Sequence, residues 1–161
     1  MSGYSARLVY RSLPSVPDQD IIGYLMGSVN DYLKSVPNCR LITEEMAKWY
    51  VDRFGGNFAD LERFIKEVLR EKVADEEEFL SQSMRKYMIE FDAVWKDPKA
   101  KVILDDLIKK ESFGSTIPYE IDALNYLVQK NIIALHANSY TWNKPLVRVA
   151  YEKFAQEKKK L

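Results

Sequence analysis

Cysteine and histidine are nearly missing from this 161-residue chain, which has one of each. The single Cys39 excludes an intrachain disulfide and a cysteine-cluster metal site, and we expect it to be a small, partly buried residue. His136 has no catalytic partner that can be recognised in the sequence, so a hydrogen-bonded structural role is favoured over a catalytic base. The sequence also has no Gly-x-x-x-x-Gly-Lys-Ser/Thr motif, and therefore no loop of the kind that cradles nucleotide phosphates. We predict no catalytic site and no metal site.

Long apolar runs and an excess of one charge are also absent. No apolar stretch approaches the ~20 residues of a membrane-spanning helix, and nothing resembles a secretory signal. Lys plus Arg and Asp plus Glu both number 24, so no overall field would attract nucleic acid or anionic lipid. Hydrophobic residues make up 47% of the chain, which is enough for a core. We therefore expect a soluble, intracellular protein with no membrane partner.

Apolar residues at helical spacing are abundant, and capping residues precede several of these stretches. Asp18, Thr43 and Asp97 are the expected N-caps, since a short polar side chain there accepts a bond from an unpaired backbone N–H. Gly23 and Gly27 lie four apart, and this spacing predicts close packing of a neighbour. The predicted helices cover residues 18–34, 43–54, 57–72, 80–95, 98–110, 118–130 and 145–156.

A sharp corner is predicted between the second and third of these helices. Gly55 and Gly56 follow Phe54, and glycine adopts the left-handed conformation that ends a helix without a Cβ penalty. Asn57 is the expected N-cap of the next helix. Asp60 stands at the third helical position, where a carboxylate suits a reciprocal cap and the helix dipole.

The pattern changes from helical to extended in the second half of the chain. Residues 132–135 and 140–142 predict two short strands joined by a turn at Asn138-Ser139. Residues 5–13, with an apolar centre at 8–10, predict either a short strand or an extended lead-in, and a further short strand is expected at 115–117. We predict a mainly α fold, in which a helical bundle is followed by a domain with a small β-hairpin. The acidic segment 73–78 is the expected boundary, which divides the chain into subdomains 1–76 and 77–161.

The order of elements in residues 77–161 resembles that of a winged-helix domain. A helix (98–110), a turn, a helix (118–130), a hairpin (132–142) and a trailing helix follow one another. The segment Leu124–Ile133 looks like the last helix of such a module entering its wing. The resemblance implies a winged-helix-like second subdomain.

The corner carries a second resemblance. Gly55-Gly56-Asn57 followed by Asp60-Leu61-Glu62 is similar to the lid motif of archaeal-type ATPases and of the mitochondrial escape protein family. The segments Leu13–Pro17 and Trp142–Ala150 fit the same pattern. The chain thus resembles the C-terminal lid and winged helix of an AAA+ or STAND-type ATPase, without its P-loop core.

This resemblance implies a module without catalysis of its own, which mediates interdomain or protein–protein interaction and regulation. Its partners would be an ATPase core domain or a neighbouring subunit, and ATP and magnesium would bind only if a P-loop core precedes the chain. The lid hinge would be Gly55–Asn57 with Asp60. Arg63 is the candidate nucleotide-sensing residue, although family members often carry this arginine just after the corner, where Ala59 stands here. A mitochondrial location would follow from the closest resemblance, but no presequence supports it.

Four residues near the wing are candidate partner contacts: Tyr140, Trp142, Lys144 and Arg148. Trp142 is either an exposed contact point or a residue packed against the trailing helix. The alternative function is nucleic-acid binding through the wing and the C-terminal basic helix. The exposed face of 118–130 offers more acidic than basic residues, which would repel phosphates.

Overall fold

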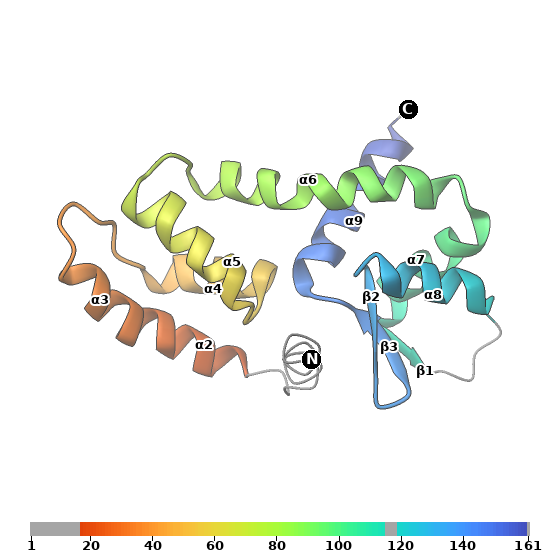
Figure 1. Cartoon of the computed structure of the whole chain (residues 1–161), viewed down its shortest axis with the longest axis horizontal. Helices are drawn as coiled ribbons and strands as arrows, with labels where there is room; N and C mark the ends of the chain where they lie inside the picture. Colours follow the sequence, from red (N-terminus) through yellow and green to blue (C-terminus); the bar gives the residue numbers. More distant parts are fainter. Residues whose placement is uncertain (1–16, 115–118, 161) are drawn as a thin grey trace, which may run out of the picture.

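The computed structural model describes residues 17–114 and 119–160, which form a mainly helical fold with one small sheet (Figure 1). The helices are α2 (Asp18–Tyr24), α3 (Asn30–Lys34), α4 (Glu44–Phe54), α5 (Phe58–Phe64), α6 (Glu76–Trp95), α7 (Pro98–Lys110), α8 (Ile121–Gln129) and α9 (Pro145–Lys159). Two π-helical segments, η1 (Leu25–Val29) and η2 (Ile65–Arg70), continue α2 into α3 and extend α5. The strands are β1 (Ser112–Gly114), β2 (Ile133–His136) and β3 (Ser139–Trp142). The predicted fold class is confirmed.

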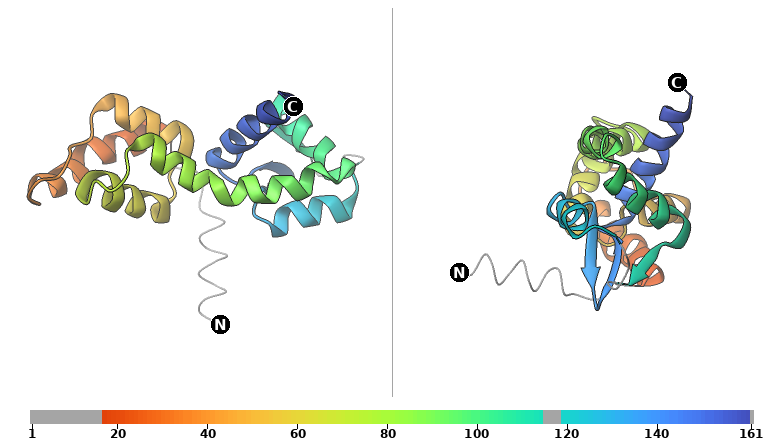
Figure 2. Two further views of the ribbon diagram at one scale, coloured as in Figure 1. Left: turned by 90° about the horizontal axis from the view of Figure 1, so that it is seen from above. Right: turned by 90° about the vertical axis from the view of Figure 1, so that its right-hand side faces the viewer.

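Helix α6 extends from one end of the molecule to the other. Helices α2 to α5 lie at one end, and α7 to α9 with the sheet lie at the other (Figures 1 and 2). Near its start, the Phe79 ring lies 5.2 Å from that of Phe54 and 5.4 Å from that of Phe64. Near its end, the Phe91 ring lies 5.2 Å from that of Tyr151 on α9. Because both ends of α6 contribute large aromatic side chains, the buried apolar residues form one continuous core.

Side-chain caps begin the helices where the sequence indicates. The Thr43 hydroxyl accepts the backbone N–H of residue 46 at 3.1 Å, and the Asp97 carboxylate accepts that of residue 99 at 3.0 Å. These two predicted caps are confirmed. The prediction for Asp18 is wrong, because Pro17 is the cap and its carbonyl accepts the first helical N–H groups. Asp75, an unpredicted cap, begins α6 by accepting the N–H of residue 78 at 2.8 Å.

The π-helical segments were not predicted, because apolar spacing does not distinguish a single wide turn from a regular one. The third helix ends at Arg70, close to the expected end at residue 72. The helix expected over 118–130 begins at Ile121 among the described residues.

The three strands form an antiparallel sheet in the order β1-β3-β2. The hairpin turn is one residue earlier than predicted, because His136 pairs with Ser139 and leaves residues 137 and 138 at the tip. Ala137 and Asn138 both have positive φ, of 47° and 66°, as a tight two-residue hairpin requires. Strand β1 precedes the strand expected at 115–117, which lies outside the described residues, as does the segment 5–13.

The outer surface of α2 and η1 differs from the prediction. A Cβ built on Gly23 or Gly27 would have no atom of the described structure within 4 Å, so the predicted packing neighbour is not found there. Tyr24 and Met26 beside them are 47% and 40% exposed. Among the helices formed by the described residues, none combines the length and apolarity that crossing a membrane requires.

Candidate functional site

The corner between α4 and α5 requires glycine. Gly55 has φ +64° and ψ −142°, a conformation that residues with a Cβ avoid. Its positive φ was predicted, although ψ differs from that of a left-handed helical residue. A Cβ on Gly55 would lie 3.4 Å from the Pro145 ring, and one on Gly56 would lie 3.2 Å from Ile21. The corner therefore lies against the first residue of α9 and against α2.

Asn57 and Asp60 complete the corner in different ways. The Asn57 side chain accepts the Asp60 N–H at 3.0 Å, which confirms the predicted cap. Asp60 itself makes no reciprocal cap. Its carboxylate accepts a hydrogen bond from the Lys144 ammonium at 2.9 Å and lies 3.7 Å from the Arg63 guanidinium.

The Asp60–Lys144 pair is well shielded from water. The side chains of Asp60 and Lys144 are only 9% and 16% exposed. The two residues are 84 positions apart, and Lys144 directly precedes α9. The pair therefore joins a predicted hinge residue of the first bundle to a predicted contact residue at the end of the wing.

Arg63 uses its guanidinium within the fold. It lies 4.9 Å above the Phe79 ring, 3.5 Å from Glu67 and 3.4 Å from the Ser83 hydroxyl. These contacts arise because residues three and four apart on α5 share a face that packs on α6. The nucleotide-sensing role of Arg63 stays a prediction, and this geometry adds no support to it.

Tyr50 places a further polar group beside Asp60 and Arg63. Its side chain is buried, and its hydroxyl has no hydrogen-bond partner among the described residues. Burial raises the pKa of Tyr50 well above its usual range, the Asp60 carboxylate raises it further, and Arg63 lowers it. We call Tyr50, Asp60, Arg63, Ser83 and Lys144 the junction cluster, because α4, α5, α6 and the start of α9 meet there.

The charged residues of the junction cluster are of the kind that hold neighbouring elements in a fixed position. It holds one carboxylate between two cations, and this charge balance favours a fixed geometry over proton transfer. Across the described ranges, no group of three or more His, Cys, Asp or Glu side chains is arranged to hold a metal ion. What the cluster does is fix the corner against α9.

The aromatic residues of the β2–β3 hairpin pack inward. The Tyr140 ring lies 5.5 Å from Phe113 on β1, and the Trp142 ring lies 5.8 Å from Tyr151 on α9. Trp142 is only partly exposed, and its buried indole N–H has no partner in the described structure. Of the two alternatives for Trp142, packing against the trailing helix is the one observed.

Arg148 is held by two carboxylates. Its guanidinium donates to Glu111 at 2.8 Å and to Glu152 at 3.0 Å. These two hydrogen bonds raise the pKa of Arg148 above its usual value. Since Lys144 is likewise paired with Asp60, a phosphate would have to compete with three carboxylates for the two cations that the nucleic-acid alternative depends on.

Sequence reasoning identified Asp60 and Lys144 but gave no reason to place them together. Tyr50 and Ser83 were missed altogether, because each lies on the apolar side of an amphipathic helix and reads as a core position. Cys39 is half-buried, as predicted. His136 was predicted to be hydrogen-bonded, but it is exposed beside the hairpin turn and its ring makes no hydrogen bond within the described residues.

A scan of protein-family models, a search of curated proteins and a search of solved structures each found no match to this chain.

Proposed function

We propose that this chain is a non-catalytic lid and winged-helix module of an AAA+ or STAND-type ATPase, which acts through interdomain or protein–protein contacts. The observation that carries the proposal is the shielded pair between Asp60 and Lys144. It links Asp60, in the first turn after the corner, to Lys144 directly before α9, so a change in the corner would be passed to the second subdomain.

The arrangement of elements supports this proposal. Helix α7, strand β1, helix α8 and the β2–β3 hairpin follow in the order expected of a winged helix, and β1 adds to the hairpin as a third strand. Helix α9 begins beside the corner of the first bundle, contacts α4, and runs along α6 with Lys158 near Asp92 (Figure 1). The corner and the wing are thus two ends of one packed unit.

The free-energy cost of breaking the Asp60–Lys144 pair resists movement of the corner relative to α9. Removing one partner from a buried ion pair costs ~3–5 kcal/mol, because the remaining charge has lost its compensation away from water. Arg63 near Asp60 and the partial exposure of Lys144 reduce this cost to roughly 2 kcal/mol, which another interaction must offset before the corner can turn away from α9. In the proposed mechanism a nucleotide-binding core sets the angle of the corner, and α9 with the wing transmits that angle to the neighbouring subunit or partner.

The test combines the full-length transcript with nucleotide titration of this chain. We expect an in-frame Gly-x-x-x-x-Gly-Lys-Ser/Thr motif upstream of codon 1, since the chain itself lacks this loop. We also expect no saturable binding of a fluorescent ATP analogue by residues 1–161. A transcript without the motif, or nucleotide binding by these residues alone, would contradict the proposal.

A mobility-shift assay separates this proposal from nucleic-acid binding. At low salt the chain should shift neither duplex nor single-stranded DNA, because Lys144 and Arg148 are engaged with carboxylates. A salt-sensitive shift that is lost when both residues are changed to Glu would favour the nucleic-acid alternative.

A further inference from the structure

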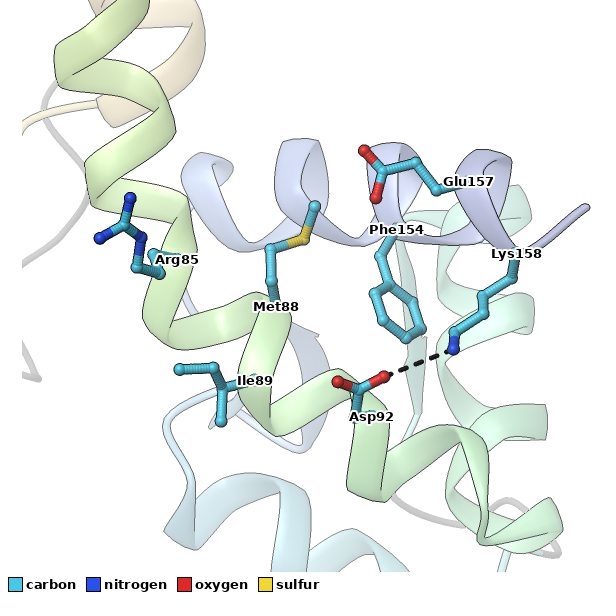
Figure 3. Close-up of a pocket in the computed structure, with 7 residues that line it drawn as sticks. All are labelled: Arg85, Met88, Ile89, Asp92, Phe154, Glu157 and Lys158. Carbon is cyan, nitrogen blue, oxygen red and sulfur yellow. Dashed lines mark ion pairs between the residues drawn. The ribbon is translucent and has the colours of Figure 1, made fainter. Parts of the chain in front are cut away.

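A shallow groove of about 310 Å³ lies between α6 and the C-terminal part of α9 (Figure 3). It is lined by Arg85, Met88, Ile89, Asp92, Phe154, Glu157 and Lys158. None of these residues belongs to the junction cluster. The groove is therefore separate from the site described above.

The centre of the groove is apolar and one of its walls is uncovered. Phe154 forms part of the floor and is 5% exposed, and Met88 beside it is half-buried. Ile89 on the rim is 67% exposed. An uncovered isoleucine beside an open apolar groove is typical of a contact surface, because both gain free energy when they leave water.

The rim of the groove carries equal numbers of basic and acidic side chains. Arg85 and Lys158 are basic, and Asp92 and Glu157 are acidic, so the rim has no net charge. Lys158 lies 3.5 Å from Asp92, whose side chain is still 62% exposed. Arg85 makes no ion pair within the described residues and lies at the opposite end of the groove from Asp92 and Lys158 (Figure 3).

We propose that a second copy of this chain occupies the groove in a two-fold, antiparallel arrangement of α6. A two-fold axis between Met88 and Ile89 brings position 85 of one copy opposite position 92 of the other. Arg85 of each copy then faces Asp92 of the second copy, and Ile89 of each copy lies opposite the half-buried Met88 of the other. The same two contacts form twice, as an isologous interface requires.

The charge pattern is what selects a second copy over other occupants. A strongly acidic or basic partner would meet one like-charged pair for each opposite pair on this neutral rim. The contact involves only the lining of one shallow groove, so we expect a transient dimer that dissociates on dilution. This surface extends the proposed function by placing the contact with a neighbouring subunit, but it does not depend on the presence of an ATPase core.

Sedimentation velocity of the full chain over a range of concentrations tests the proposal. The chain should shift from monomer to dimer with rising concentration. Ile89→Asp should raise the dissociation constant at least about tenfold, because it buries a charge at the centre of the contact. Ile121→Asp is the matched control, since Ile121 is 70% exposed on α8, and it should leave the dissociation constant unchanged.

The ion pairs have their own test. Arg85→Glu should weaken the dimer about tenfold by placing two like charges opposite each other, whereas Lys109→Glu on α7 makes the same charge change elsewhere and should have no effect. All four substituted side chains are exposed, and thermal melting should confirm that each variant is folded. A wild-type chain that stays monomeric at millimolar concentration, or an Ile89→Asp variant that dimerises as well as the wild type, would overturn the proposal. Neither result bears on the nucleotide titration, so the two proposals fail separately.

Discussion

Replacing Lys144 by methionine isolates the contribution of the pair that joins the corner to α9. Methionine keeps most of the length and apolar surface of lysine but removes the charge. The substitution leaves the Asp60 carboxylate, with 9% of its side chain exposed, without its hydrogen-bonded cation. The structure of the corner itself is not altered by the change.

The expected size of the effect follows from what Asp60 keeps. Losing one partner of a buried pair costs ~3–5 kcal/mol. The guanidinium of Arg63 remains 3.7 Å from the carboxylate, and the Lys144 side chain is 16% exposed. Both facts reduce the cost, so we expect a loss of roughly 2 kcal/mol in the free energy of unfolding. In a domain of this length such a loss lowers Tm by roughly 4–8 °C.

Urea denaturation followed by circular dichroism measures this change. Lys48→Met is the matched control, because Lys48 pairs with Glu44 at 3.0 Å on an exposed surface, and it should change the free energy of unfolding by no more than about 0.5 kcal/mol. In the double variant Asp60→Asn/Lys144→Met the loss should be smaller than the sum of the two single losses by about 1 kcal/mol or more. A loss for Lys144→Met no larger than that of the control would mean that the Asp60–Lys144 pair does not stabilise the fold.

The remaining predictions concern two glycines and two tyrosines. Gly55→Ala should destabilise the chain by ~1–3 kcal/mol, because its φ of +64° with ψ of −142° suits glycine alone, as urea denaturation will show. Gly23→Ala, in an open position of α2, should instead stabilise it by ~0.5–1 kcal/mol. An alkaline titration followed by phenolate absorbance measures the tyrosine pKa values. Burial and the hydrogen bond to Asp106 should raise the pKa of Tyr119 to about 12. Tyr50 should ionise at a higher pH than an exposed tyrosine. Since the folded state then retains protons that the unfolded state releases, the contribution of these two tyrosines to stability should be full below pH ~10 and be lost above it, and Tyr50→Phe should make that loss smaller.

Local chemistry explains why most of the helix ends could be predicted. Thr43, Asn57 and Asp97 are caps because each places a short polar side chain directly before a helical stretch. The side chain and the backbone N–H that it accepts lie within four residues of the sequence. Pro98 and Pro145 begin α7 and α9 for a similarly local reason, since proline suits the first helical turn. The cap predicted at Asp18 is wrong because the helix begins at Asp18 itself, which leaves Pro17, without a side-chain acceptor, at the N-cap position.

The junction cluster could not be predicted in the same way, because its members come together only through tertiary packing. Asp60 has a sufficient local explanation as a residue of the first helical turn, so nothing in the sequence calls for a cation 84 residues away. Lys144 likewise reads as a surface residue before a proline. The corner and the end of the β2–β3 hairpin meet because α6 packs on both groups of helices and α9 begins beside the corner (Figure 1).

Hydrogen exchange at the corner in Lys144→Met tests the link between the two subdomains most directly. The Asp60 amide is bonded to the Asn57 side chain, and the Leu61 amide to the Asn57 carbonyl, so both report on the corner. We predict that these two amides exchange roughly fivefold faster or more in the variant, while the Lys101 amide in α7 keeps its rate. Unchanged exchange at Asp60 and Leu61, or an equal increase at Lys101, would contradict the account.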